Sequence, residues 1–228
     1  MAPSSKQIIA ELQKRAVPGK AEPMRAYLKS EMPSVGVRIP DARAIAKTLF
    51  GPSPRSSLKE LERLAMPLWN DATYREERFV ALNVLRLRPH LRLMSAEAAP
   101  MLEKLILSGA WWDLVDELSS HVVAAALEND PVGMGKVLRR WAKSDELWLK
   151  RAALVCQVVR GEDTDDELLA FAIEHAVDGK DFFLRKGIGW AMRSLAKHRP
   201  DVVRSWLKRW AERLSPLSVR EAKKGLER

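Results

Sequence analysis

The stretch DFFLRKGIGWAMRSLAK, from Asp181 to Lys197, repeats its apolar residues with the period of an α-helix. At about 100° per residue, one stripe collects the apolar side chains Leu184, Ile188, Ala191, Met192 and Leu195. The opposite face, within about 60°, carries Lys186, Trp190, Arg193 and Lys197. A tryptophan among cations is compatible with two interpretations. This face either packs on a neighbouring helix pair or offers an aromatic platform within a phosphate-attracting strip.

The same helical period recurs from end to end, while alternating β-branched runs are missing. We expect about a dozen helices, with approximate spans 5–16, 22–32, 40–50, 57–69, 74–87, 95–108, 111–128, 131–143, 146–160, 165–176, 181–198, 201–211 and 218–226. Short connections favour antiparallel pairs stacked side by side. The pattern therefore predicts an all-α fold, a HEAT-like helical-repeat solenoid with a concave basic groove, as a single domain over residues 1–228. A helical bundle is the alternative, since no crisp sequence repeat is present.

Composition and charge narrow the class of protein. With 228 residues and 46% hydrophobic composition, the chain can bury a substantial core. Its formal net charge of +9 is concentrated in residues 180–228, which hold 14 Lys and Arg against 5 Asp and Glu. Such a basic segment favours a polyanionic partner, nucleic acid or acidic lipid, although basic faces that are merely solvated are the alternative.

Several classes of protein lack support. The single cysteine, Cys156, lies in an apolar stripe and is predicted to be a core residue. No apolar run has the length of a membrane span, and the start lacks a secretory signal. The four histidines show no spacing typical of a zinc site. We therefore expect a cytoplasmic protein with no membrane association, metal or cofactor.

The segment WWDLVD, from Trp111 to Asp116, places acid beside tryptophan in a basic chain. On a helix from Trp111, the expected core stripe is Trp111, Leu114, Val115, Leu118, Val122 and Ala125. Trp112 and Asp116 are four residues apart on an adjacent flank, where their side chains can lie side by side. Asp113 is expected to be only a favourable charge in the first helical turn.

The helix from Glu146 supplies a second set of unusual residues. Its core stripe is Leu149, Ala152, Ala153 and Cys156, which leaves Trp148 and Arg151 together on a different face. An exposed arginine on a helix is ordinary. Arg151 becomes a candidate functional residue only if it points at Asp116.

Together these segments resemble the AlkD-type bacterial DNA alkylation-repair glycosylases, a family of all-helical proteins built of HEAT-like repeats. The resemblance runs through KAEPMRAYLKSEMPSVGVRIPDAR (20–43), WWDLVD (111–116), WLKRAAL (148–154), FFLRKGIGWAMR (182–193) and PLSVREA (216–222). No single motif is long, but their order and spacing are specific.

The resemblance implies a catalytic group made of Trp112, Asp116, Arg151 and Trp190. It also implies an aromatic position near DNA at Tyr27 and a basic DNA-contacting position at Arg193. Lys186, Lys197 and Trp148 join these two as predicted DNA-binding residues, because they share faces with the catalytic candidates.

The activity implied by the resemblance is hydrolysis of the N-glycosidic bond of cationic N3- and N7-alkylpurines, such as 3-methyladenine and 7-methylguanine. We expect the partner to be double-stranded DNA carrying alkylated purines, bound by a monomer without an extruded-base pocket, and we expect the protein to be nucleoid-associated when bound. One alternative is a non-catalytic HEAT-like scaffold that recognises DNA structure, which does not require Asp116. Another is a protein-interaction solenoid in which Trp190 anchors a peptide.

Overall fold

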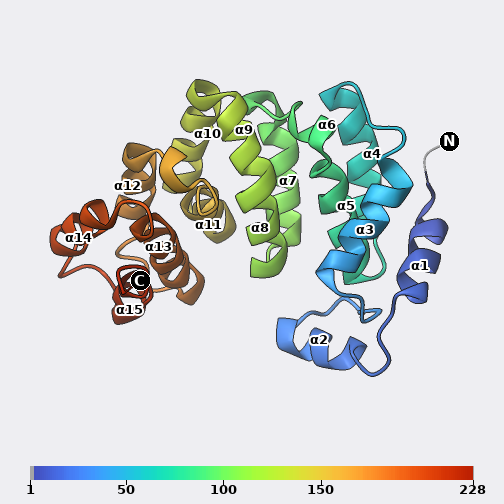
Figure 1. The fold of residues 1–228 in the computed structure, drawn as a ribbon, viewed down its shortest axis with the longest axis horizontal. Coiled ribbons are helices and arrows are strands. Elements are labelled where there is room, and N and C mark those ends of the chain that lie inside the picture. The colour runs from blue at the N-terminus through green and yellow to red at the C-terminus, as the bar shows by residue number, and fades with distance from the viewer. Residues whose placement is uncertain (1–2, 228) are drawn as a thin grey trace. The chain divides into compact units, whose positions relative to one another are not determined.

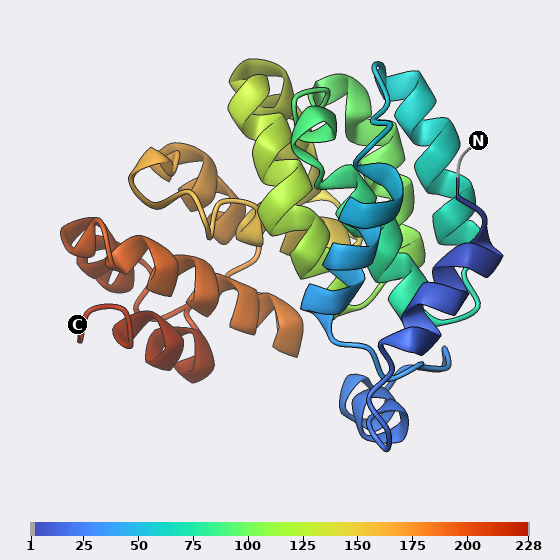
Figure 2. The same ribbon diagram turned by 45° about the vertical axis from the view of Figure 1, so that its right-hand side comes forward.

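The computed structural model of the protein describes residues 3–227, and every regular element among them is helical (Figures 1 and 2). The all-α prediction is confirmed. Contacts within the chain divide it into two compact units, of which unit 1 ends at Met94 and unit 2 begins at Ser95. The concave basic groove and the single domain over residues 1–228 are predictions about the whole chain, and both stay predictions. None of the described helices is long and apolar enough to cross a membrane.

Unit 1 is built around three long helices. Its elements are α1 (Ser5–Lys14), α2 (Ala21–Leu28), α3 (Ile39–Phe50), α4 (Leu58–Asn70), α5 (Arg75–Leu85) and α6 (Arg88–Leu91). Both α3 and α4 pack on α5, so that α5 is buried along almost its whole length. The shorter α2 lies apart from α4 in both views and buries none of its residues. It ends at Lys29, which adopts the left-handed conformation (φ 50°) and stops the helix short of the expected residue 32.

Unit 2 is built around helix α11 (Leu147–Val155). It contains η1 (Ala96–Ala98), α7 (Ala99–Gly109), α8 (Trp112–Leu118), η2 (Ser119–Val123), α9 (Ala124–Asn129), α10 (Pro131–Lys143), α11 (Leu147–Val155), η3 (Gly161–Asp163), α12 (Asp166–Glu174), α13 (Phe182–Ala196), α14 (Pro200–Arg209) and α15 (Pro216–Lys223). Helix α11 is central, because it contacts α7, α8, α10, α12 and α13. Helix α13 then packs closely on α15.

The expected helix 111–128 is interrupted by a turn of π-helix, η2, between α8 and α9. A π-turn adds a residue and shifts the phase of every side chain after it. The core position therefore falls on Ala126, which is fully buried, in place of the predicted Ala125. The buried stripe before the π-turn, Leu114, Val115 and Leu118, agrees with the helical wheel.

Other core predictions are confirmed. The stripes Leu149, Ala152, Ala153 and Cys156 of α11 and Leu184, Ile188, Ala191, Met192 and Leu195 of α13 are buried. Burial raises the pKa of the Cys156 thiol to about 12, so this residue remains a neutral core side chain at physiological pH. Pro40 and Pro131 occupy the first turns of α3 and α10, where the missing N–H of proline costs no helical hydrogen bond.

Candidate active site

Asp116 and Arg151, which are 35 residues apart in the chain, form a bidentate ion pair. Arg151 Nε donates to Asp116 Oδ1 and Arg151 Nη2 donates to Asp116 Oδ2, both at 2.7 Å. The side chain of Arg151 is 4% exposed and that of Asp116 is 15% exposed. The sequence left open whether Arg151 points at Asp116, and in the structure it does.

A third hydrogen bond fixes the remaining edge of the guanidinium. Arg151 Nη1 donates to the backbone carbonyl of Phe183, in the first turn of α13. The N–H donors of a buried guanidinium need acceptors. Here the acceptors are the Asp116 carboxylate of α8 and the Phe183 carbonyl of α13, and Arg151 of α11 binds both. The pair therefore ties together the three helices that carry the predicted catalytic residues.

Gly187 provides the space for this arginine. A β-carbon at Gly187 would lie 3.2 Å from Arg151 Nη1 and 3.6 Å from the Leu154 side chain. Gly189, two residues on, lets α15 approach, because a β-carbon there would lie 2.6 Å from that of Glu221. The GIG segment thus serves two faces of α13 at once, which the sequence analysis did not foresee.

The environment of Asp116 acts on its pKa in both directions. Burial raises the pKa of this carboxyl above its ordinary value, the hydrogen bonds and charge of Arg151 oppose the rise, and the negative charge of Asp113 adds to it. Asp113 stands in the first turn of α8, as predicted, but it is buried and not a solvated surface charge. Asp116 is therefore a poorly hydrated carboxylate whose ionised form relies on Arg151.

An aromatic cluster of Trp111, Trp148 and Phe183 packs beside the ion pair. The ring centroids of Phe183 lie 5.3 Å from Trp111, in an edge-to-face arrangement, and 5.1 Å from Trp148. The centroids of Trp111 and Trp148 are 6.0 Å apart. The guanidinium carbon of Arg151 lies 5.9 Å from the Phe183 ring centre. This cluster forms an apolar wall on one side of the arginine.

Two expectations about this cluster were wrong. Trp111 precedes α8 with an extended backbone (φ −152°, ψ 148°) and is half-buried beside Phe183, so it is not part of the helical core stripe. Trp148 is 9% exposed and packs within the cluster, although the wheel placed it away from the core stripe. Phe183 was missed altogether, because nothing in FFLRK distinguishes it from its exposed neighbour Phe182.

Trp112 and Trp190 are half-buried and lie on α8 and α13. Trp112 is the first residue of α8, four positions before Asp116 and hence on the same side of the helix. Trp190 follows Gly187 by three positions, so α13 presents it near the side that adjoins Arg151. Their predicted role beside a substrate stays a prediction.

The predicted basic strip on α13 is largely paired within the protein. Lys186 Nζ lies 3.0 Å from the buried carboxylate of Glu221, and Arg193 also pairs with it. Lys224 Nζ, 2.7 Å away, is a third partner of the same carboxylate. Hydrogen bonding from Lys224 is the largest cause that lowers the pKa of Glu221 to about 2. Only Lys197 of the strip is exposed, and the packing interpretation of this face holds for Lys186 and Arg193.

Tyr27 belongs to unit 1, where it projects from α2 with 75% of its surface exposed. The segment after α2 is held by the buried carboxylate of Glu76, which accepts hydrogen bonds from the backbone N–H groups of Val35, Gly36 and Val37. A charged acceptor for several backbone donors fixes this loop firmly. The exposure of Tyr27 suits a residue that contacts a partner, and its role stays a prediction.

Within residues 3–227, no three His, Cys, Asp or Glu side chains gather in a group that could hold a metal ion. The functional groups of the candidate site are the Asp116 carboxylate, the Arg151 guanidinium and the aromatic rings beside them.

The chain is similar to proteins described as DNA alkylation repair enzymes. The sequence model of a family described as "DNA alkylation repair enzyme" matches residues 8–226. A solved structure, described as a predicted DNA alkylation repair enzyme from Enterococcus faecalis, is 26% identical in sequence with a TM-score of 0.81. The match covers 93% of this chain and 97% of the other. No curated protein matches the chain.

Proposed function

The chain belongs to the DNA alkylation repair enzyme family, and from this premise we propose that it is a DNA glycosylase. Its proposed substrates are cationic N3- and N7-alkylpurines in duplex DNA, such as 3-methyladenine and 7-methylguanine. The observation that carries the proposal is the desolvated, bidentate pair of Asp116 and Arg151. A carboxylate held in this way is suited to stabilising a cation that forms next to it.

The chemistry requires little beyond that anion. An alkylated purine is already positively charged, so it leaves as a neutral base while positive charge develops on the deoxyribose. No proton has to be donated to the leaving group. Asp116 stabilises the oxocarbenium ion and orients a water molecule toward it.

The other three residues support Asp116. Arg151 is proposed to hold the carboxylate in place and ionised; a phosphate contact by Arg151 is disfavoured because its nitrogens already face Asp116 and the Phe183 carbonyl. Trp112 and Trp190 are proposed to flank the deoxyribose, where their rings exclude bulk water and present electron-rich faces to the cation. Because the reaction centre is the sugar, the base need not be extruded into a pocket.

We propose that the protein binds the damaged duplex as a monomer in the cytoplasm, at the nucleoid. Tyr27 and Lys197, both exposed, are the proposed direct contacts with DNA. Lys186 and Arg193 are paired with Glu221, so we propose that they attract DNA only through their positive charge and not by direct contact. Trp148 is proposed to contribute to DNA binding only as part of the aromatic cluster with Trp111 and Phe183.

The deciding experiment is incubation of the protein with methylated duplex DNA, followed by identification of the released bases by mass spectrometry. We expect free 3-methyladenine or 7-methylguanine from the wild type and release about a thousandfold slower from Asp116→Asn. The matched control is Asp201→Asn, which removes a carboxylate that is 93% exposed. Tight binding without base release would favour the alternative, a non-catalytic scaffold that recognises DNA structure.

A further inference from the structure

Helix α10 carries a second group of cations, apart from those that the sequence analysis singled out. Its outward face presents the α10 stripe, which consists of Lys136, Arg139, Arg140 and Lys143. These positions follow the spacing i, i+3, i+4 and i+7, so they lie on one side of the helix over about 10 Å. The other side of α10 is the core face, with Met134, Val137, Leu138, Trp141 and Ala142 buried.

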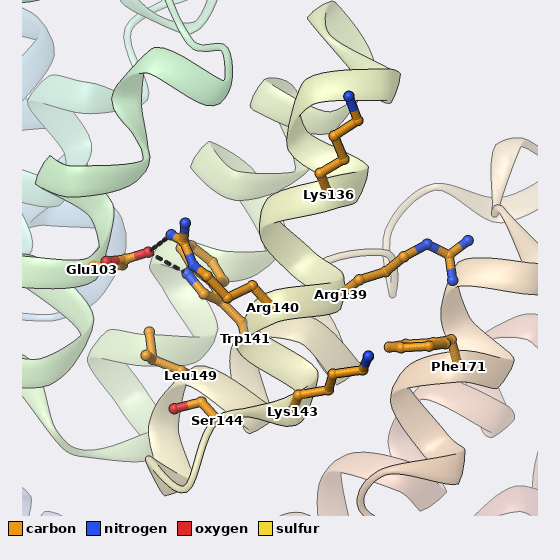
Figure 3. A pocket seen from close by; sticks show the side chains of 9 residues that line it. All are labelled: Glu103, Lys136, Arg139, Arg140, Trp141, Lys143, Ser144, Leu149 and Phe171. Atoms are coloured by element: carbon orange, nitrogen blue, oxygen red, sulfur yellow. Dashed lines mark hydrogen bonds and ion pairs between the residues drawn. The ribbon is translucent and has the colours of Figure 1, made fainter.

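The stripe borders an open hollow of about 750 Å³ (Figure 3). The remaining residues that line this hollow are Glu103, Trp141, Ser144, Leu149 and Phe171. Phe171 of α12 forms one wall, and Arg139 and Lys143 both extend toward its ring, at 4.8 and 5.4 Å from the ring centre. Cation–π contacts of this kind hold the two long side chains in place without neutralising their charge.

The charges around the hollow are unbalanced. Glu103 is its one acidic lining residue, and it is already engaged by Arg140 and by Trp141 Nε1, which donates to it at 2.6 Å. Lys136, Arg139 and Lys143 form no ion pair with any residue of the described chain. This situation is the reverse of that on α13, where Glu221 takes up the charges of Lys186 and Arg193.

The stripe lies on the far side of α11 from the candidate active site. Leu149 of α11 lines the hollow, whereas Arg151, two residues on, points at Asp116. Two residues correspond to a rotation of about 200° around a helix. A ligand in the hollow therefore does not occupy the space beside Asp116.

We propose that the α10 stripe is a second DNA-binding site, which takes the phosphodiester backbone of undamaged DNA. A row of unpaired cations along one helix fits a polyanion better than a single small anion, because duplex DNA carries about one negative charge per 1.7 Å. An open hollow also suits a continuous backbone. That the polyanion is DNA rests on the proposed function; that the stripe binds a polyanion does not. The backbone that is bound belongs either to the damaged duplex itself, beyond the lesion, or to a second duplex.

The test compares two triple variants in binding undamaged duplex at several salt concentrations. The stripe variant is Lys136→Gln, Arg139→Gln and Lys143→Gln. The control variant, Lys6→Gln, Lys59→Gln and Arg92→Gln, removes the same charge from exposed positions of other segments. Each phosphate contact contributes about 0.9 to the slope of log affinity against log salt. We therefore expect the slope of the stripe variant to fall by about 2 to 3, and that of the control to stay near the wild-type value.

A bridging assay separates the two sources of the backbone. Protein is added to beads that carry one short duplex, and capture of a second, labelled duplex is measured. Capture by the wild type and the control but not by the stripe variant assigns the site to a second duplex. A slope change on a 40-base-pair duplex without any capture assigns it to the same duplex. Both outcomes support the proposal.

Equal slopes and equal capture for the stripe and control variants would overturn the proposal. In that case, binding of a polyglutamate peptide by the wild type but not by the stripe variant would assign the stripe to an acidic protein partner. Single-turnover base release from saturated methylated duplex, measured on the same proteins, keeps this failure distinct from failure of the glycosylase assignment. We expect that rate to be unchanged in both triple variants. If the triple substitution lowers the Tm, Lys136→Gln with Lys143→Gln retains Arg139 on Phe171 and should still lower the slope by about 2.

Discussion

Removing Asp116 alone should damage catalysis more than removing Asp116 and Arg151 together. At an effective dielectric near 20, a carboxylate about 4 Å from the developing cation stabilises it by about 4 kcal/mol. The guanidinium is bonded to both oxygens of that carboxylate. For a cation that approaches the carboxylate from the opposite side, the guanidinium would be about 8 Å away and would destabilise the cation by about 2 kcal/mol. The intact pair thus contributes about 2 kcal/mol.

The two variants separate these contributions. Asp116→Asn leaves an unbalanced guanidinium, so the barrier should rise by about 4 kcal/mol and the rate should fall about a thousandfold. Asp116→Asn with Arg151→Met removes both charges, so the barrier should rise by only about 2 kcal/mol and the rate should fall about 30-fold. The double variant should therefore be about 30 times faster than the single one.

The assay is single-turnover release of 7-methylguanine from a defined duplex at saturating protein, which excludes effects of affinity and product release. Duplex affinity and Tm of each variant serve as controls, since an unpaired buried charge also lowers stability. A double variant as slow as Asp116→Asn would refute the reasoning and show that Arg151 acts on the substrate directly. Full activity of Asp116→Asn would refute the site itself.

Three further predictions follow from other contacts. Trp190→Ala should slow single-turnover release more than it weakens duplex binding; a loss of affinity with an unchanged rate would make Trp190 a docking residue. Gly187→Ala should lower the release rate a few-fold, because its β-carbon would lie 3.2 Å from Arg151 Nη1 and would shift the guanidinium by a few tenths of an ångström against Asp116, whereas Gly135→Ala, with nothing within 4 Å, should leave the rate unchanged and raise the Tm. Burial lowers the pKa of His90 in the folded protein. As the pH falls below about 6.5, the unfolded chain therefore takes up a proton at His90 before the folded protein does. The free energy of unfolding should decrease over the pH range between the unfolded-state and the folded-state pKa of His90. Urea unfolding at pH 5 to 8 measures this decrease, which should be smaller in His90→Gln; an equal pH dependence in both proteins would exclude His90 as its origin.

The fold was largely predictable because helical periodicity is a local property. The buried faces of α11 and α13 follow from their own residues, and so do most helix boundaries. The failures lie where the period breaks: the π-turn η2 moves the core position from Ala125 to Ala126, and no composition signal in SSHVV announces it. The expected helix 165–176 begins one residue later, at Asp166, because Asp165 is its N-cap and its side chain accepts from Leu168 N–H.

The candidate site was predictable only in part, because it depends on partners that are distant in sequence. A helical wheel can place Trp112 beside Asp116, but not Arg151 beside either of them. Glu221 shows the same limit more clearly. It is an ordinary acidic residue in PLSVREA, and only the packing of α15 on Gly189 brings it to Lys186 and Arg193.

The fate of those two cations bears on how the protein can hold DNA. If Lys186 or Arg193 moved to a phosphate, the buried carboxylate of Glu221 would lose one of its partners. A buried charge that lacks a partner is costly, and this cost opposes the move. The pairing therefore fits a structural role, fixing α15 against α13 and so keeping Trp190 in position. Free cations must then come from elsewhere, and the structure offers them at Lys197 and along α10. The net charge of the C-terminal segment thus overstates the charge that it can present to a phosphate. Some of its basic side chains are paired with Glu221 and stabilise the packing of α15 on α13.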